Sequence, residues 1–134
     1  MKSKGVALCV VCAIAAAACA RPCNDVTFAG FREADRVVVA VNMNPVSPPI
    51  TDPATISKLV AFAVSHEQGW EMPVPDTPVP PVKLDFYSGQ RFLGHLGIGT
   101  TFLETQGCDY FVSRSVSAGD RQLLMAMLHL PEGS

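Results

Sequence analysis

The feature that most constrains the fold is a pair of alternating apolar runs, at residues 82–86 and 92–98. Apolar side chains at every second position are typical of a strand that buries one face. Gly89 lies between the two runs and supplies a turn, because glycine adopts positive φ at little steric cost. The sequence therefore predicts a β-hairpin, with Phe92 on one face of the second strand and His95 on the other.

Three glycines in the segment GHLGIGTT, residues 94–101, have a spacing that phosphate-binding loops share. In those loops the glycines lie between a strand and a helix, whereas here they fall within the alternating strand. No lysine and no helix start follow them. We therefore predict bulges or a tight bend of the sheet at this place rather than a phosphate site.

Other segments predict the remaining strands. Residues 26–42 include the β-branched run VVVAV and predict a strand pair with a turn at residues 33–35. Residues 43–53 contain four prolines and predict a loop. After the central hairpin, residues 100–105 and 110–112 predict two further short strands.

Two helices are predicted from their end signals. The first begins with Asp52 as N-cap and Pro53 as its first residue, and Gly69 closes it in the left-handed conformation. The second begins with Ser117 as N-cap and Asp120 at the third helical position. Apolar stripes give each helix one buried face. The stripe residues are Ile56, Leu59, Val60 and Ala63 in the first helix, and Leu123, Leu124, Met127 and Leu128 in the second.

Residues 70–81, WEMPVPDTPVPP, are here called the strap, and they contain five prolines. Such a composition predicts an extended path without ladder hydrogen bonds. We expect the strap to lead from the first helix to the sheet and to bury Trp70, Met72 or Val74. Recognition by a proline-binding partner is the alternative, through the P-x-x-P spacings of the segment.

Charge and length narrow the class of protein. Apart from Lys2 and Lys4, the chain carries eight basic and twelve acidic residues, and its basic residues are scattered singly. Because nucleic-acid binding needs clustered positive charge, no nucleic-acid partner is expected. Residues 21–134 have the length of one domain. The patterns together predict one α+β domain with an antiparallel sheet of about four to six strands and two helices packed on one face, in the order ββα-βββα.

The N-terminus carries the marks of an export signal. Lys2 and Lys4 precede an uncharged, mostly apolar run over residues 5–20, as in secretory signal peptides. The run is too short and too rich in alanine for a membrane-spanning helix. We therefore predict that residues 1–20 are a cleaved signal peptide and that the protein is exported.

Two endings of this signal remain open. Residues 18–20, Ala-Cys-Ala, fit a cleavage pattern that would release a soluble periplasmic or secreted chain starting at Arg21. The segment AAAC that ends at Cys19 instead resembles the lipobox of bacterial lipoprotein precursors, a resemblance that covers residues 2–19. Ala16 stands where that family usually has leucine. The resemblance implies an acylated Cys19 and a periplasmic or outer-membrane lipoprotein held to the membrane by its lipid.

Cysteine count predicts one covalent link in the domain. Cys9 and Cys12 lie in the predicted signal, so their C-x-x-C spacing is not a redox motif. If Cys19 is removed or lipidated, Cys23 and Cys108 remain as an even pair in an oxidising compartment. We predict a disulfide between them. Two buried free thiols, or a nucleophilic or metal-binding cysteine, are the alternatives.

Signals of catalysis are sparse. His66, His95 and His129 lack metal-ligand spacing, and no Gly-x-Ser-x-Gly motif is present. His95 is placed to face Asp85 or Tyr87 across the hairpin, either as a catalytic trio or as a surface polar cluster. We predict a non-catalytic binding or accessory protein of the cell envelope, without metal or cofactor, that binds an envelope protein, peptidoglycan or a small ligand. The alternative is a small periplasmic enzyme that uses His95, Asp85 and Tyr87.

Overall fold

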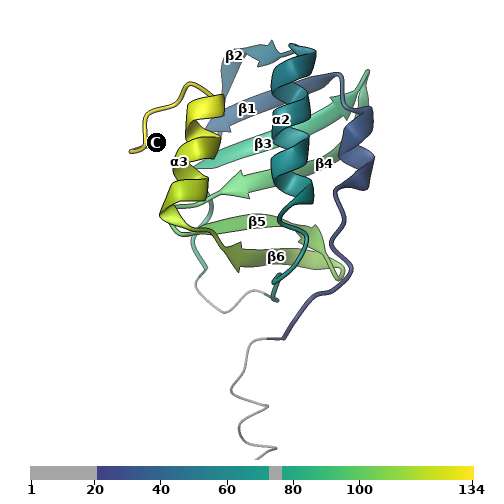
Figure 1. The fold of residues 1–134 in the computed structure, drawn as a ribbon, viewed down its shortest axis with the longest axis vertical. Helices are drawn as coiled ribbons and strands as arrows, with labels where there is room; N and C mark the ends of the chain where they lie inside the picture. Colours follow the sequence, from purple (N-terminus) through teal and green to yellow (C-terminus); the bar gives the residue numbers. More distant parts are fainter. Residues whose placement is uncertain (1–20, 73–76) are drawn as a thin grey trace, which may run out of the picture.

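A single antiparallel sheet with two α-helices on one face forms the domain (Figure 1). The computed structural model describes residues 21–72 and 77–134. The predicted signal peptide, with Cys19, and Val74 of the strap lie outside these residues. In chain order the elements are the 3-10 helix η1 (Ala29–Glu33), β1 (Arg36–Val41), β2 (Asn44–Ile50), α2 (Pro53–Val64), β3 (Val82–Ser88), β4 (Arg91–Ile98), β5 (Phe102–Gly107), β6 (Tyr110–Ser115) and α3 (Ala118–Met127).

The strands lie in the order β2-β1-β3-β4-β5-β6, and every neighbouring pair is antiparallel. The predicted α+β class and the order of strand and helix groups are therefore confirmed. Pairing continues past the β6 edge, because Glu71 forms antiparallel bridges with Ser113 of β6 and with Pro22. The sheet thus extends beyond the four to six strands expected. None of the described helices is long and apolar enough to cross a membrane.

The central hairpin is β3 and β4, as predicted. Val82, Leu84 and Phe86 are fully buried beneath the helices, and Gly89 makes the turn with φ 58°. The register is irregular next to Phe86, opposite Gly94, whose φ is 145°. The bulge that the glycine spacing predicted is therefore present.

The first strand pair differs from the prediction. The proline-rich segment expected to be a loop forms the edge strand β2, which pairs with β1. Asn42 and Met43 make the turn between them, with φ of 49° and 69°. Prolines are tolerated in β2 because an edge strand has one side without a partner for its N–H groups. The residues before β1, predicted as a strand, form the helix η1 instead.

Helix η1 and the segment before it cover one end of the core with aromatic rings. The ring of Phe31 stacks on Phe86 of β3, with ring centroids 4.1 Å apart. Phe28 lies between Phe31 and Trp70, at centroid distances of 5.1 and 5.9 Å. Trp70 is 1% exposed, so its predicted role as an anchor of the strap is confirmed. These contacts favour a helix over a strand here because both phenylalanines must point to the same side.

Helix α2 begins as predicted but ends earlier. The Asp52 carboxylate accepts a hydrogen bond from the Thr55 N–H at 3.0 Å. The hydrogen bonds from Thr55 lower the pKa of this carboxyl group. Ser65 is the C-cap, and its hydroxyl donates to the Phe62 carbonyl oxygen at 2.7 Å. Gly69 adopts φ 82° in the loop that follows and does not close the helix.

Helix α3 has the predicted N-cap but buries a different face. Ser117 accepts a hydrogen bond from the Asp120 N–H at 3.1 Å. Leu123, expected in the core, is 53% exposed, whereas Met125 and Arg121 are buried. Burial of Arg121 is tolerated because each of its three guanidinium nitrogens donates a hydrogen bond. It donates to three carbonyl oxygens at 2.8–3.0 Å, those of Gly99, Glu132 and Ser134.

The end of the strap packs on the sheet face opposite the helices, which we call the open face. Gly97 of β4 makes this possible, because a Cβ atom there would lie 2.6 Å from Cγ of Pro80 and 3.2 Å from Cβ of Glu104. Only a residue without a side chain allows this approach.

We expect Gly97→Ala to destabilise the domain by about 1–3 kcal/mol, since the added methyl group overpacks the contact with Pro80. Gly119→Ala is the matched control, because nothing lies within 4 Å of its Cβ position in α3. That change is expected to be neutral or to stabilise by up to about 1 kcal/mol. Urea unfolding of both variants measures the difference, and equal midpoints would contradict the close packing of strap and sheet.

Candidate functional site

The sheet is nearly divided between β4 and β5. Only two residue pairs join these strands, Gly97 with Glu104 and Ile98 with Leu103. Beyond them the strands separate, and the Thr105 hydroxyl donates to the His95 carbonyl oxygen at 2.7 Å. A side chain thus satisfies a backbone group that the ladder leaves without a partner.

A cavity of about 370 Å³ occupies this separation, within the size range of small-molecule sites. We call it the β4–β5 slot. Of the described residues that line it, none is charged. They are Thr27, Phe28, Phe31, Phe92, Leu93, Gly94, His95, Thr105 and Gln106. The slot thus combines aromatic walls with a few neutral polar groups, as ligand pockets commonly do.

Four polar side chains gather beside the slot on the open face, and we call them the open-face cluster. They are Lys83, Asp85, His95 and Glu104. Asp85 and His95 are directly opposite each other on β3 and β4. Lys83 Nζ lies 3.6 Å from Asp85 Oδ1, and His95 Nε2 lies 3.7 Å from Glu104 Oε1.

Two atoms of this cluster are buried without a hydrogen-bond partner among the described residues. They are Nε2 of His95 and Oδ1 of Asp85. His95 is only 5% exposed, and it also lines the slot. Because buried polar atoms in native proteins are nearly always hydrogen-bonded, unpaired ones point to a functional constraint.

Burial shifts two pKa values of the cluster in opposite directions. Burial lowers the pKa of His95, and the positive charge of Lys83 lowers it further, while Asp85 acts in the opposite sense. Burial raises the pKa of Glu104, and Lys83 opposes that shift. His95 is therefore neutral at pH 7, and its contact with Glu104 is not an ion pair.

Aromatic side chains flank the open-face cluster. The Phe111 ring meets the His95 ring edge-on, with centroids 5.6 Å apart. Phe92 lies against Tyr87 at the same centroid distance. Phe92 and Phe111 are 50% and 57% exposed. The open face therefore presents apolar rings to solvent around a polar centre.

The structure assembles two members of the predicted trio. Asp85 and His95 come together, whereas Tyr87 lies two residues further along β3, between Phe92 and the Arg36 guanidinium, which is 4.5 Å from its ring centroid. Sequence reasoning missed Lys83 and Glu104. Glu104 precedes a buried residue in an alternating segment, but its position next to His95 depends on the β4–β5 register, which the sequence does not show.

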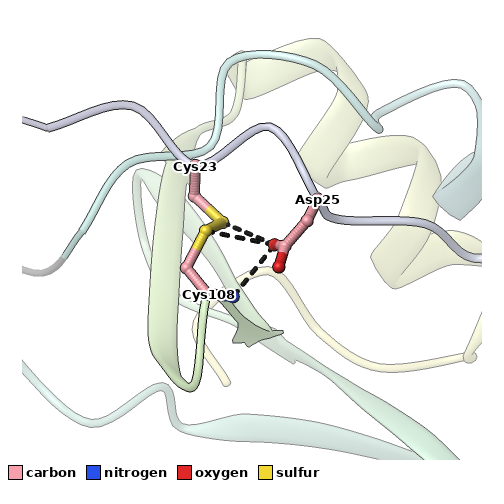
Figure 2. The surroundings of a disulfide bond; sticks show 3 residues. All are labelled: Cys23, Asp25 and Cys108. Atoms are coloured by element: carbon pink, nitrogen blue, oxygen red, sulfur yellow. Dashed lines mark hydrogen bonds between the residues drawn. A yellow bond between two sulfur atoms is a disulfide. The ribbon is translucent and has the colours of Figure 1, made fainter.

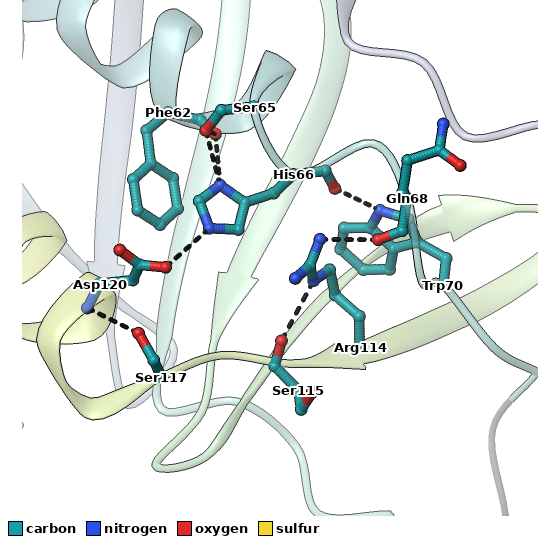
Figure 3. Close-up of polar contacts among 9 residues, drawn as sticks. All are labelled: Phe62, Ser65, His66, Gln68, Trp70, Arg114, Ser115, Ser117 and Asp120. Atoms are coloured by element: carbon teal, nitrogen blue, oxygen red, sulfur yellow. Dashed lines mark hydrogen bonds and ion pairs between the residues drawn. The ribbon is translucent and has the colours of Figure 1, made fainter.

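A second histidine forms a contact between the helices (Figure 3). His66 Nδ1 lies 2.7 Å from the Phe62 carbonyl oxygen and 2.9 Å from the Ser65 hydroxyl, and Nε2 lies 3.2 Å from Asp120. These are the residue types of a hydrolase triad. However, the Ser65 hydroxyl donates to Phe62 and caps α2, so it is not activated as a nucleophile. We interpret the group as a clamp that joins the end of α2 to the start of α3.

The predicted disulfide is confirmed. Cys23 and Cys108 are joined with an S–S distance of 2.04 Å (Figure 2). The Asp25 carboxylate accepts a hydrogen bond from the Cys108 N–H at 2.9 Å and lies against both sulfur atoms. These three residues are close enough to hold a metal ion, but sulfurs in a disulfide are not thiolate ligands. The group is therefore a covalent staple.

Comparison of the chain with protein-family models, with curated proteins and with solved structures finds no significant match. The candidate site therefore rests on the geometry of the β4–β5 slot and the open-face cluster.

We expect Lys83→Gln to raise the pKa of both His95 and Glu104, because it removes a positive charge that lowers both. Lys58→Gln, on the exposed side of α2, is the matched control and is expected to leave both values unchanged. Titration followed by side-chain NMR resonances measures the pKa values. Opposite shifts of His95 and Glu104 would contradict the arrangement.

The same variants test the pH dependence of stability. The folded-state pKa of His95 lies below the unfolded value of 6.5, so the unfolded state binds this proton more readily. The contribution of His95 to the free energy of unfolding therefore decreases as pH falls below about 6.5, while the raised pKa of Glu104 acts in the opposite sense at lower pH. This decrease is expected to be smaller in Lys83→Gln than in the wild type or in Lys58→Gln.

Proposed function

We propose that the chain is an exported binding protein whose ligand enters the β4–β5 slot and contacts the open-face cluster. The proposal rests on one observation, the buried ring of His95 and its unpaired Nε2 atom. Its ring is buried at the junction of slot and cluster, and Nε2 has no hydrogen-bond partner among the described residues. A ligand that supplies this partner removes the cost of an unpaired buried group, which is about 1–3 kcal/mol.

The site supports binding better than catalysis. A small enzyme is favoured by one observation, the opposite pKa shifts of His95 and Glu104 within one cluster. Yet the cluster itself offers no hydroxyl or thiol nucleophile, and Thr105 uses its hydroxyl on the His95 backbone. Tyr87 is turned toward Arg36 and Phe92. We therefore assign His95 to ligand binding.

Export is supported by the disulfide between Cys23 and Cys108, since such bonds persist in oxidising compartments outside the cytoplasm. The lipobox resemblance adds a proposed anchor, an acylated Cys19 four positions before Cys23. The domain would then be held close to the membrane surface, with an envelope protein or peptidoglycan as accessible partners.

We expect protein purified from the native membrane fraction to carry acyl chains on an N-terminal Cys19. Its intact mass is expected to rise by about two daltons on reduction, because reduction adds two hydrogens to the disulfide. Mass spectrometry of the reduced and non-reduced protein measures both. A chain that begins at Arg21 would remove the anchor but retain export, and a cytoplasmic chain that keeps residues 1–20 would remove both.

The slot is tested with the disulfide-bonded domain, residues 21–134, and a library of neutral aromatic and hydroxylated fragments. We expect fragments to shift the amide NMR resonances of His95 and Thr105. Gln106→Trp is expected to abolish these shifts, because the larger side chain fills the slot from its rim. Gln122→Trp, on the exposed side of α3, is the matched control and is expected to retain them. Equal binding by both variants would show that fragments bind elsewhere.

A further inference from the structure

We infer that the open-face cluster is a carbohydrate subsite, an inference that rests on the proposed binding function. It takes a neutral sugar residue whose hydroxyl groups bridge Lys83, Asp85 and Glu104 and whose apolar ring face packs on Phe111. The ligand class follows from the hydrogen-bonding groups, the charges and the aromatic rings that the open face presents.

The hydrogen-bonding groups of the cluster alternate between donor and acceptor. Lys83 only donates, whereas the carboxylates of Asp85 and Glu104 accept. Adjacent sugar hydroxyls both donate and accept, so a single pair of them satisfies a cation and a carboxylate at once. Lys83 and Asp85 lie side by side, with Nζ and Oδ1 3.6 Å apart. Because Oδ1 is buried, a hydroxyl group would reach this carboxylate at its other oxygen. The unpaired Nε2 of His95 provides a further position for a hydroxyl group.

The charges of the cluster disfavour ionic ligands. An anion would meet the carboxylates of Asp85 and Glu104, and a cation would compete with Lys83 for the same oxygens. A metal ion is not favoured, because the described residues contain a suitably close set of three ligand groups only at Cys23, Asp25 and Cys108. A neutral polar ligand is the class that remains.

Aromatic rings beside these polar groups can bind the apolar face of a sugar ring. A pyranose ring has apolar C–H faces and a polar rim, and aromatic side chains bind such apolar faces over a large area. Phe111 is 57% exposed and touches the His95 ring. A sugar stacked on Phe111 therefore places its polar hydroxyl rim next to the open-face cluster. Phe92, 50% exposed, provides a second ring for a longer chain of sugars.

Access to the cluster is partly open. The side chains of Lys83, Asp85 and Glu104 are 49%, 23% and 20% exposed, so hydroxyl groups reach their outer atoms directly. Nε2 of His95 is buried, and the His95 ring meets the Phe111 ring edge-on. Access of a hydroxyl group to Nε2 therefore requires a neighbouring side chain to move, and the proposal assigns this movement to Phe111, which is 57% exposed.

NMR titration of the disulfide-bonded domain tests the inference. The probes are the β-1,4-linked trisaccharide of N-acetylglucosamine, cellotriose and maltotriose, with trilysine and inorganic phosphate as charged comparisons. We expect at least one trisaccharide to shift the resonances of Lys83, His95, Glu104 and Phe111 in a saturable manner. Binding of trilysine or phosphate at these residues in place of the sugars would overturn the inference.

Two variants locate the contact. Phe111→Ala and Glu104→Gln are each expected to weaken trisaccharide binding about tenfold. Leu123→Ala is the matched control, because Leu123 is a similarly exposed apolar residue on α3 and its removal is expected to leave binding unchanged. Well-dispersed spectra show that each variant is folded. Equal affinity of all three variants would place the sugar elsewhere and overturn the inference.

The outcomes also separate this inference from the proposed function. If fragments enter the β4–β5 slot and no trisaccharide shifts the cluster resonances at millimolar concentration, the carbohydrate class is wrong and the binding function stands. If neither fragments nor trisaccharides shift His95, both fail.

Discussion

The pairing between β4 and β5 is the constraint on which the site depends. Two residue pairs hold the halves of the sheet together, and a longer ladder would close the β4–β5 slot. The halves stay aligned because other contacts join them. Cys23 is bonded to Cys108 at the β5–β6 turn, and its N–H donates to the carbonyl oxygen of Trp70. The staple and the bridges of Glu71 thus hold the β6 side in place while β4 and β5 separate.

The N-terminal segment converts this separation into a lined cavity. One end is fixed by Cys23, and the other is fixed where the Phe31 ring stacks on Phe86. Between them, Phe28 also contributes to the slot wall. A Cβ atom at Gly94 would lie 2.7 Å from the Phe31 ring. Glycine at this position is therefore needed for the ring to reach the sheet, and the resulting bulge turns Phe92 toward the open face.

The sequence predicts the elements that depend on local patterns. It does not predict contacts that depend on the register between distant strands. Alternating apolar residues predict the β3–β4 hairpin, and capping residues predict both helix N-caps. The cysteine count predicts the disulfide. A period-2 count places Phe92 on the face opposite His95, because such a count does not include the bulge at Gly94. The apolar stripe predicts Leu123 in the core, but the structure leaves it exposed and buries Arg121 instead, whose guanidinium donates to the carbonyl oxygens of Gly99, Glu132 and Ser134. The contact between Glu104 and His95 follows only from the short β4–β5 ladder.

The edges of the sheet bear on the kind of partner the domain accepts. A partner that adds a strand needs a free row of backbone N–H and C=O groups. At one edge, β2 carries Pro45, Pro48 and Pro49, which have no N–H to offer. At the other edge, Glu71 already pairs with Ser113. With prolines in β2, the Glu71 bridge on β6 and the helices on one face, the proposed binding function is best served by side chains of the open face. This favours a ligand bound by polar and aromatic groups over one bound through its backbone.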